Sequence, residues 1–235
     1  MICARGGRHD ERPRGHADQH TDEPPSHAAD CSGRSPLTVR DFYESVWADA
    51  PDDPEPWLFA TRRALLLGEA RKGERVLDLG CGAGRFVAAL REAGAEPIGV
   101  ELAEAALERA RRNVPGADLR LVAPDGSLPL GHGEIDLVWC SEVLEHVPDT
   151  VGFLTEARRV LKPGGRLLVT VPDHGVARRT AIALARYEAH YDPLGQHLRF
   201  YTRRSLAAAL EATGFAGIRC TRFAPGALQG RAVRG

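Results

Sequence analysis

The stretch VLDLGCGAG at residues 76–84 decides the fold class of this chain. A short run of leucine and β-branched residues leads into Gly80, Gly82 and Gly84, and a helix-forming segment follows. Glycine permits a tight turn between a strand and a helix, and it lets a ligand lie against bare backbone. The N–H groups at the start of the following helix point towards such a ligand. We therefore predict a strand–turn–helix unit that binds a small molecule at its turn.

Two features separate this turn from the turns that bind dinucleotides. The glycine spacing is GxGxG, whereas NAD-dependent enzymes use GxGxxG. Asp78 stands shortly before the first glycine, where its carboxylate would repel a pyrophosphate and favour a ligand with cationic groups. Glu101 ends the next expected strand, from which a carboxylate can bind the hydroxyls of a ribose. A cationic ligand with a ribose is therefore indicated, and an NAD(P)-dependent oxidoreductase is the weaker alternative.

Outward from the turn, strand and helix patterns alternate, which predicts a mainly parallel sheet with right-handed crossovers. The segment IDLVWC at residues 135–140 is a nearly continuous apolar run, as expected of a strand covered on both faces. We expect an α/β fold, Rossmann-like and doubly wound, with helices on both faces of the sheet. The expected strands are 75–79, 97–101, 119–122, 135–140, 166–171 and 218–223, and the expected helices between them are 86–93, 103–113, 150–161 and 202–212.

Differences in composition divide the chain into regions. Residues 1–36 are rich in Arg, Asp, His, Gly and Pro and nearly lack large apolar residues, so we expect a disordered tail. We expect residues 37–72 to form an N-terminal helical cap, with Leu58, Ala64, Leu65 and Leu66 of the second helix facing inward. Residues 73–235 then form the Rossmann-like domain, with a cap insertion at about 173–200.

Composition excludes several classes of protein. Lys+Arg number 31 and Asp+Glu number 32, so the net charge is -1, which argues against a nucleic-acid-binding protein. No apolar run approaches the roughly 18 residues that span a bilayer, and the first residues lack the apolar core of a signal peptide. We therefore expect a cytoplasmic location. The five cysteines form no CxxC pair, so we expect neither a zinc ribbon nor a disulfide framework. No cluster of metal ligands is evident in the sequence, so we expect no bound metal.

Five segments together resemble one known family, the class I S-adenosylmethionine-dependent methyltransferases. The resemblance is greatest to the small-molecule branch that includes ubiquinone-biosynthesis-type methyltransferases. The segments are VLDLGCGAGRF at 76–86, GVEL at 99–102, DLVWCSEVLEHV at 136–147, RVLKPGGRLLVTVP at 159–172 and HLRFYT at 197–202. The resemblance implies S-adenosyl-L-methionine as co-substrate, S-adenosyl-L-homocysteine as product and a small-molecule methyl acceptor. A non-catalytic subunit that binds S-adenosylmethionine beside an active partner remains the alternative function.

The resemblance also implies a set of site residues. Glu101 corresponds to the ribose ligand, and Asp125 with Gly126 falls where an acid meets the adenine amino group. Tyr43 and the neighbouring Trp47 lie on a helix that either folds over the cofactor as a lid or simply packs against the domain. The cofactor-binding residues implied are Tyr43, Asp78, Gly80, Cys81, Gly82, Gly84, Glu101, Leu102, Asp125, Gly126, Cys140 and Ser141.

Two histidines are the candidates for a general base. His146 follows the fourth expected strand, at the carboxyl end of the sheet, and His197 opens the last of the five segments. An imidazole is suited to proton transfer near neutral pH. For both residues a structural role remains the alternative, such as holding a neighbouring loop. Asp125 is similarly either an adenine contact or a turn residue beside Gly126.

The C-terminal segment departs from the family pattern. Members usually end in a hairpin whose last, antiparallel strand inserts between strands five and six. Only residues 224–235 follow the sixth expected strand, and they are rich in Gly and Arg. We therefore expect the last antiparallel strand to be short or missing.

Overall fold

The computed structural model of the chain describes residues 38–51, 54–185, 187, 191 and 196–235. The expected disordered tail lies outside these residues. Contacts between residues separate Met1–Pro36 from a second unit, Leu37–Gly235, and all described residues belong to this second unit.

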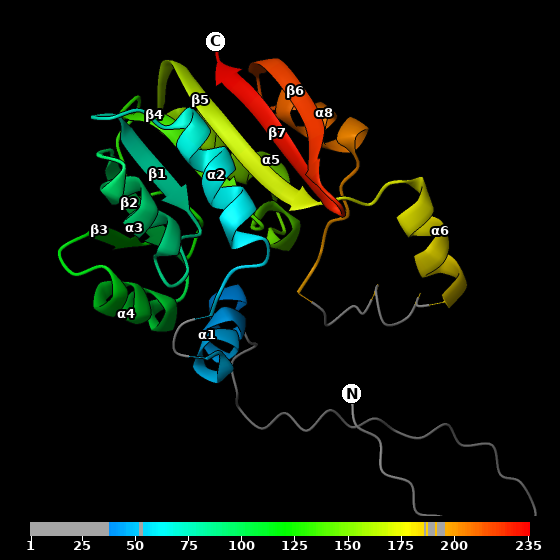
Figure 1. Ribbon diagram of the computed structural model, residues 1–235, viewed down its shortest axis with the longest axis horizontal. Helices are drawn as coiled ribbons and strands as arrows, with labels where there is room; N and C mark the ends of the chain where they lie inside the picture. Colours follow the sequence, from blue (N-terminus) through cyan, green and yellow to red (C-terminus); the bar gives the residue numbers. More distant parts are fainter. Residues whose placement is uncertain (1–37, 52–53, 186, 188–190, 192–195) are drawn as a thin grey trace, which may run out of the picture. The chain divides into compact units, whose positions relative to one another are not determined.

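Seven strands form one sheet, which confirms the Rossmann-like α/β class. The strand order is β3-β2-β1-β4-β5-β7-β6 (Figure 1). Neighbouring strands from β3 to β5 are parallel, and β7 runs antiparallel to both of its neighbours. The strands are β1 Arg75–Leu79, β2 Glu96–Glu101, β3 Asp118–Leu121, β4 Ile135–Ser141, β5 Leu161–Pro172, β6 Phe215–Ala224 and β7 Ala227–Arg234.

Helices cover both faces of the sheet because the strand order proceeds outward from β1 in both directions, to β2 and β3 on one side and to β4 and β5 on the other. Crossovers of the usual right-handed sense then lie on opposite faces. Helices α2, α3 and α4 contact one another in sequence on one face, and α5 and α8 contact each other on the opposite one. None of the described helices is long and apolar enough to cross a membrane. The helices are α1 Val39–Asp49, α2 Phe59–Glu69, α3 Arg85–Glu92, α4 Glu104–Asn113, the 3-10 helix η1 Leu144–His146, α5 Thr150–Val160, α6 Val176–Ala185 and α8 Arg203–Ala212.

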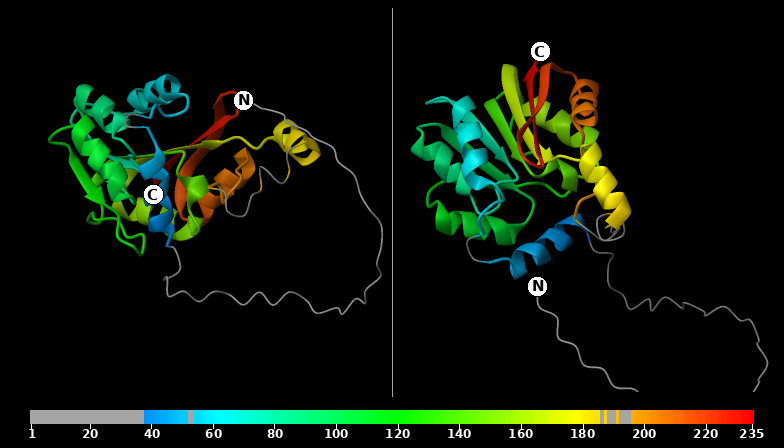
Figure 2. Two further views of the ribbon diagram at one scale, coloured as in Figure 1. Left: turned by 90° about the horizontal axis from the view of Figure 1, so that it is seen from below. Right: turned by 45° about the vertical axis from the view of Figure 1, so that its right-hand side comes forward.

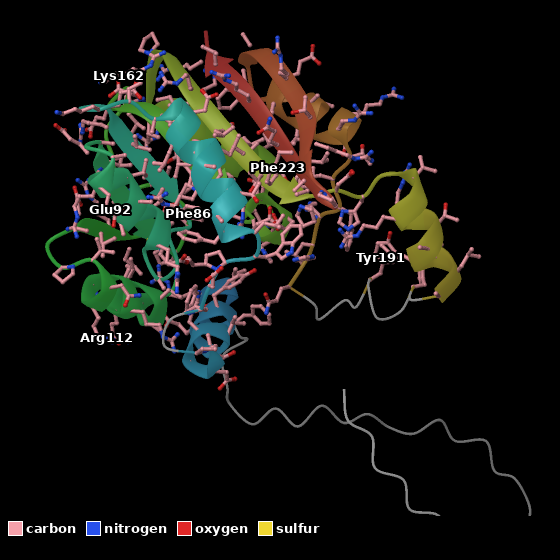
Figure 3. All side chains as sticks on the ribbon, viewed as in Figure 1. Phe86, Glu92, Arg112, Lys162, Tyr191 and Phe223 are labelled. Carbon is pink, nitrogen blue, oxygen red and sulfur yellow. The ribbon has the colours of Figure 1, made fainter. Side chains whose placement is uncertain are left out.

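Alternating side chains of the strands supply two apolar layers. On one face Phe86 and Trp139 pack edge to face, with ring centroids 5.3 Å apart. On the other, Val169 of β5 lies in the same apolar cluster as Leu206 and Leu210 of α8. Phe86 and Glu92, both labelled in Figure 3, belong to the same helix α3; Phe86 is buried, whereas the Glu92 side chain is exposed. This is the amphipathic pattern expected of a helix that packs on a sheet.

The last antiparallel strand is neither short nor missing, so that prediction was wrong. β7 spans eight residues and forms backbone ladders with β5 and β6 (Figure 2). Its small residues suit this central position: a Cβ on Gly230 would lie 2.9 Å from Val169 Cγ1 and 3.1 Å from Leu206 Cδ2. The low apolar content of the segment therefore reflects close packing under α8 rather than the absence of a strand.

The prediction of which α2 residues face inward was also wrong in part. Leu66 is buried as predicted, but Ala64 is exposed, and Arg62 is the second buried side chain of this helix. Beyond the carboxyl ends of the parallel strands lies α1 (Figure 2). Ligands of open α/β sheets bind at this edge.

Candidate functional site

The loop between β1 and α3 is shaped by three glycines with left-handed backbone conformations. Gly80, Gly82 and Gly84 have φ values of 88°, 50° and 85°. A Cβ on Gly80 would lie 2.4 Å from Val143 Cγ2, and one on Gly82 would lie 3.0 Å from the Trp47 ring. Side chains are excluded at both positions, so the backbone of this loop is left open to a ligand on its cavity side.

Glu101 is held at the end of β2 by backbone N–H groups. Its carboxylate accepts hydrogen bonds from the N–H of Leu102 at 2.6 Å, Gly82 at 3.1 Å and Ala103 at 3.4 Å. Burial raises the pKa of Glu101, and the three N–H groups oppose that rise. The acid is thereby fixed beside the glycine loop.

Asp78 is a buried acid without a complete set of partners. Its side chain is 1% exposed, and its Oδ2 atom has no hydrogen-bond partner among the described residues. Burial, and then the charge of Glu101, raise the pKa of Asp78 to about 8. Two carboxyl groups therefore lie under one loop, where a cationic ligand would relieve their repulsion.

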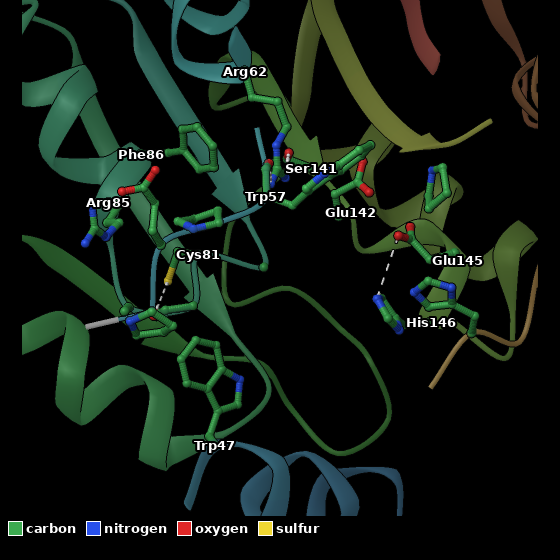
Figure 4. A pocket seen from close by; sticks show the side chains of 18 of the residues that line it. Trp47, Trp57, Arg62, Cys81, Arg85, Phe86, Ser141, Glu142, Glu145 and His146 are labelled. Atoms are coloured by element: carbon green, nitrogen blue, oxygen red, sulfur yellow. Dashed lines mark hydrogen bonds and ion pairs between the residues drawn. The ribbon is translucent and has the colours of Figure 1, made fainter. Parts of the chain in front are cut away.

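Two adjoining cavities open at this edge of the sheet, with volumes of about 1090 Å³ and 560 Å³. Both are bounded by Trp47, Gly80, Gly82, Ser141 and His146. In Figure 4, Trp47 and Arg62 approach the smaller cavity from opposite sides, and Glu145 and His146 form another wall. The larger cavity is further lined by the cofactor candidates Tyr43, Glu101, Leu102, Asp125 and Gly126, and the smaller one by Cys81, Glu145 and His197.

Three predicted cofactor residues do not line either cavity. Asp78 lies under the glycine loop, and Gly84 is the N-cap of α3, where a Cβ would meet Val114 Cγ2 at 3.1 Å. The Cys140 side chain is 1% exposed and belongs to the apolar core. These three residues can support the site but do not form its surface.

Helix α1 lies over the glycine loop and carries Tyr43 and Trp47. The Tyr43 ring meets the His146 ring edge to face, with centroids 6.1 Å apart. Burial and the nearby charges of Glu101 and Glu145 raise the pKa of Tyr43 to about 12. The tyrosine is therefore a neutral hydroxyl at the wall of the larger cavity.

The other end of α1 is attached to α4 by a buried arginine. Arg109 is 8% exposed and donates hydrogen bonds to the carbonyl oxygens of Trp47 and Ala50, the second at 2.8 Å. Its guanidinium lies 5.7 Å from the centroid of the Trp47 ring. These contacts place Trp47 on the glycine loop.

Asp125 and Gly126 lie on the rim of the larger cavity. The Asp125 carboxylate accepts hydrogen bonds from the Ser127 N–H at 3.0 Å and the Ser127 hydroxyl at 2.7 Å. Gly126 has a φ of 82°. Asp125 thus shapes the turn, as expected of a turn residue beside Gly126. It also lines the larger cavity, as an adenine contact would.

Arg62 is a charged site residue that the sequence prediction missed. Its side chain is 3% exposed, and it donates to the Ser141 hydroxyl at 2.8 Å and to the carbonyl oxygen of Trp57. The signal was an arginine one helical turn before Leu66, on the stripe that faces the sheet. This guanidinium is a buried positive charge in the wall of the smaller cavity.

The segment after β4 brings both histidine candidates together. Glu142 has a φ of 56°, which is unusual for a residue other than glycine and turns the chain sharply at the cavity. Its carboxylate accepts a hydrogen bond from the Thr170 hydroxyl at 3.1 Å. The rings of His146 and His197 then pack with centroids 4.8 Å apart.

Family comparison agrees with this fold. The chain matches the model of the methyltransferase domain over residues 56–219. It is 42% identical over 111 residues to a 37.1 kDa protein of transposon TN4556 from Streptomyces fradiae, a match that covers 45% of this chain and 32% of that protein. It is 35% identical over 130 residues to the ubiquinone biosynthesis O-methyltransferase of Thiobacillus denitrificans, covering 53% of this chain and 56% of the relative. The chain thus spans about a third to just over half of the length of these relatives.

Solved structures show the same fold. The phosphoethanolamine N-methyltransferase 2 of Haemonchus contortus, in complex with S-adenosyl-L-methionine, superposes with a TM-score of 0.65 at 19% identity. That superposition covers 84% of this chain and 60% of the other. The family match includes β1, the glycine loop, Glu101 and η1, and so it contains most of the site described above. By its sequence and its fold, this chain belongs to the methyltransferase domain family.

Proposed function

We propose that this protein is an S-adenosylmethionine-dependent methyltransferase that acts on a small-molecule acceptor. The observation that carries the proposal is the position of Glu101, at the end of β2 and hydrogen-bonded to the Gly82 N–H of the glycine loop. Glu101 lines the larger cavity, and a carboxylate at the end of this strand can bind ribose hydroxyls. The methyltransferase names of the relatives support the same activity.

The described residues fit S-adenosylmethionine in shape and in charge. Gly80 and Gly82 leave a bare backbone that a Cβ would obstruct. The unpartnered Oδ2 of Asp78 lies in a buried, acidic environment with Glu101. A ligand with an ammonium and a sulfonium group suits such a site better than a pyrophosphate does. The adenine end is then assigned to the part of the larger cavity bounded by Asp125 and Gly126.

Methyl transfer requires alignment more than activation by the protein. When bound, S-adenosylmethionine supplies a methyl group that its sulfonium already makes electrophilic. The residues of this chain hold the acceptor in line and exclude water, with Trp47 and Tyr43 covering the cavity. Burial lowers the pKa of His146, so its imidazole is neutral near pH 7 and can accept a proton. His146 and His197 remain the two candidates for this role.

The acceptor site is assigned to the smaller cavity. Its walls contain Trp57, Arg178 and His197, which come from the expected cap at 37–72 and the insertion at about 173–200. A volume of about 560 Å³ accommodates a metabolite of modest size. We therefore assign both cap segments to acceptor binding and residues 73–235 to the methyltransferase domain.

Calorimetry with S-adenosylmethionine and S-adenosylhomocysteine tests the cofactor assignment. The purified chain is expected to bind both, and Glu101→Ala is expected to weaken binding by at least about tenfold, because a charge-assisted hydrogen bond contributes about 1.5–3 kcal/mol. Glu108→Ala is the matched control, since Glu108 is exposed on the adjoining helix α4. No measurable affinity of the native chain for either compound would refute the proposal.

Turnover distinguishes an enzyme from a cofactor-binding subunit. The chain is incubated with methyl-labelled S-adenosylmethionine and a metabolite extract, and label is followed into small molecules. Transfer of the label by the native chain, and its loss in Glu101→Ala, supports the assignment as an enzyme. Binding without transfer to any acceptor favours the non-catalytic subunit, and binding of NAD(P) alone favours the oxidoreductase alternative.

A further inference from the structure

Two residues other than glycine have a left-handed backbone conformation in the part of the chain that the structure describes. Leu58, the N-cap of α2, has a φ of 55°, and Glu142, which follows β4, has a φ of 56°. A Cβ makes this conformation unfavourable, so it persists only where the surrounding structure holds it. Strained residues of this kind gather at functional sites. The contacts that hold these two turns are therefore candidates for a functional role.

One side chain, that of Arg62, binds the residue that precedes each of these turns. Its Nη2 group donates to the carbonyl oxygen of Trp57, directly before Leu58. Its Nη1 group donates to Ser141 Oγ at 2.8 Å, directly before Glu142. Figure 4 shows the Arg62 side chain directed towards Trp57 and Ser141. A single buried guanidinium thus joins the two strained turns.

A chain of hydrogen bonds continues from Ser141 to Glu142. The hydroxyl of Thr170 donates to Glu142 Oε1 at 3.1 Å, and the hydroxyl oxygens of Ser141 and Thr170 lie 2.9 Å apart. Because the one hydroxyl hydrogen of Thr170 is used on the carboxylate, Ser141 donates to Thr170 and accepts from Arg62. The side-chain hydrogen bonds therefore run in one direction, from the guanidinium of Arg62 to the carboxylate of Glu142.

The two turns differ in how firmly the rest of the fold holds them. Ser141 is paired with Thr170 in the parallel ladder between β4 and β5, so the sheet fixes its position. Trp57 belongs to residues 54–58, the loop before α2, which lies outside the described strands and helices and is here called the Trp57 loop. Its indole is half exposed. Arg62 therefore anchors a loop of the cap to the edge of the sheet.

Both ends of this anchor lie at the proposed acceptor site. Trp57 lines the smaller cavity, and Ser141 and Glu142 line both cavities. Ser141 thus stands where the larger cavity, assigned to the cofactor, adjoins the smaller one, assigned to the acceptor. The separation between Trp57 and Ser141 consequently sets the position of an acceptor relative to the cofactor.

We propose that Arg62 is a positioning residue for methyl transfer, which acts by anchoring the Trp57 loop to Ser141. This role rests on the proposed function. In-line transfer requires the acceptor atom to lie close to the methyl carbon and opposite the sulfur, and a misplacement of about 1 Å can lower the rate about 100-fold. Arginine suits this role because its planar fork presents several N–H donors. The single ammonium of a lysine cannot bind both acceptors in the same geometry.

Fluorine NMR of the ligand-free chain tests the anchor. The full chain is labelled with 5-fluorotryptophan, which gives one signal for each of its three tryptophans, and the Trp57 signal is assigned from Trp57→Phe. We expect Ser141→Ala to shift or broaden the Trp57 signal, because Arg62 loses the acceptor that ties it to the sheet. Ser45→Ala is the matched control, since Ser45 is exposed and its hydroxyl donates to Phe42 of the same helix.

Arg62→Lys separates the anchor from a direct effect of Ser141 on the Trp57 loop. In the Arg62→Lys background, Ser141→Ala is expected to leave the Trp57 signal where Arg62→Lys alone has placed it, because the connection is already broken. An equal change in both backgrounds, or no change in the native one, would overturn the proposed role. Arg62→Gln provides the same comparison should Arg62→Lys fail to fold.

Methyl transfer supplies the functional readout. With methyl-labelled S-adenosylmethionine at saturation and the metabolite extract, Arg62→Lys is expected to lower the rate of transfer by at least about tenfold. Its affinity for S-adenosylhomocysteine should stay at the native level, because the sheet still holds Ser141. Arg63→Lys, on the same helix but at a 41% exposed side chain, should change neither quantity. A native rate in Arg62→Lys refutes the positioning role.

The outcome is separable from that of the proposed function, because the fluorine experiment needs neither cofactor nor acceptor. Calorimetry with S-adenosylmethionine is run on the same preparations. Cofactor binding by a chain whose Trp57 signal is unaffected by Ser141→Ala refutes the role of Arg62 and leaves the methyltransferase intact. A Trp57 signal that depends on both Arg62 and Ser141, in a chain without cofactor affinity, keeps the anchor and refutes the proposed function.

Discussion

The side chain of Glu44 on α1 caps the first turn of α4 by binding the backbone N–H of Glu104. Glu44 Oε1 accepts from Glu104 at 2.6 Å, and Oε2 accepts from Ala105 at 3.0 Å. Ala103, the N-cap residue of α4, offers no side-chain acceptor. A residue distant in the sequence therefore supplies the cap, and its negative charge lies at the positive end of the helix dipole. This contact joins the lid to the loop that carries Glu101.

Glu44→Ala removes this cap, and we expect it to lower the free energy of unfolding by about 1 kcal/mol. The dissociation constant for S-adenosylmethionine should rise as well, because the start of α4 directly follows Glu101. Chemical denaturation and calorimetry measure the two effects. Glu108→Ala, on the exposed face of α4, should change neither quantity. Equal cofactor affinity in the native chain and Glu44→Ala would show that the lid and the cofactor site are independent.

Gly80→Ala should destabilise the chain more than Gly116→Ala. Both glycines have positive φ values, 88° and 74°, so each alanine carries a backbone cost of roughly 1 kcal/mol. A Cβ on Gly80 would also lie 2.4 Å from Val143 Cγ2, whereas one on Gly116 meets nothing within 4 Å. Urea unfolding of both variants gives the comparison.

The cause of the larger effect is tested by a double-mutant cycle. Val143→Ala removes the methyl group that a Cβ on Gly80 would meet, so the two substitutions together should cost less than the sum of their separate effects. Strict additivity would mean that the backbone conformation, and not the contact with Val143, requires glycine at position 80.

Asp78→Asn should become more stable relative to the native chain as the pH rises. In the folded chain the pKa of Asp78 is about 8, far above its ordinary value, because of burial and then the charge of Glu101. Between the unfolded and folded pKa values the unfolded state binds fewer protons, so the free energy of unfolding falls as pH rises. The slope from one such group is at most about 1.4 kcal/mol per pH unit. Asparagine does not ionise and removes this slope.

Denaturation of both proteins at pH 5, 6.5 and 8 provides the measurement. The free energy of unfolding of Asp78→Asn, relative to that of the native chain, should increase across this range. It should level off above about pH 8, because Asp78 is then ionised in both the folded and the unfolded native chain. Glu101 contributes a slope of the same sign in both proteins, and so it cancels in the difference. A constant difference would mean that Asp78 is ionised throughout the range in the folded state.

Arg62→Lys should destabilise the chain by about 1–3 kcal/mol, although it conserves the charge. One guanidinium reaches both Ser141 and the Trp57 carbonyl from a buried position, and a single ammonium cannot reproduce that geometry. Arg63→Lys is the matched control, because the Arg63 side chain is 41% exposed and forms an ion pair with the exposed Glu92. If the two substitutions have equal effects on urea unfolding, Arg62 has no structural role beyond its charge.

Local sequence patterns were sufficient for the part of the site that is built from neighbouring residues. The order of strand, glycine turn and helix around Gly80 follows from backbone sterics. Glu101 could be predicted as a site residue because it stands at the end of a strand. Parallel crossovers then place both at one edge of the sheet. The predicted surface residues Gly80, Gly82, Glu101 and Ser141 accordingly line the cavities.

Residues whose roles depend on distant partners could not be predicted in this way. β7 was expected to be short or missing because its segment has few large apolar residues, yet it has a central position where Val169 and Leu206 leave room only for Gly230. Arg62 was overlooked because an arginine on a helix is ordinarily exposed.

The sequence by itself determined the Rossmann-like order of the elements, the glycine turn and the acid at the end of β2, because each depends on contacts within a few residues. Only the tertiary structure decided that α1 caps α4, that Arg62 is buried against Ser141, and that Glu145, His146 and His197 meet. These contacts join segments far apart in the chain. Their free energy is realised only when the sheet has assembled, and so no local pattern records them.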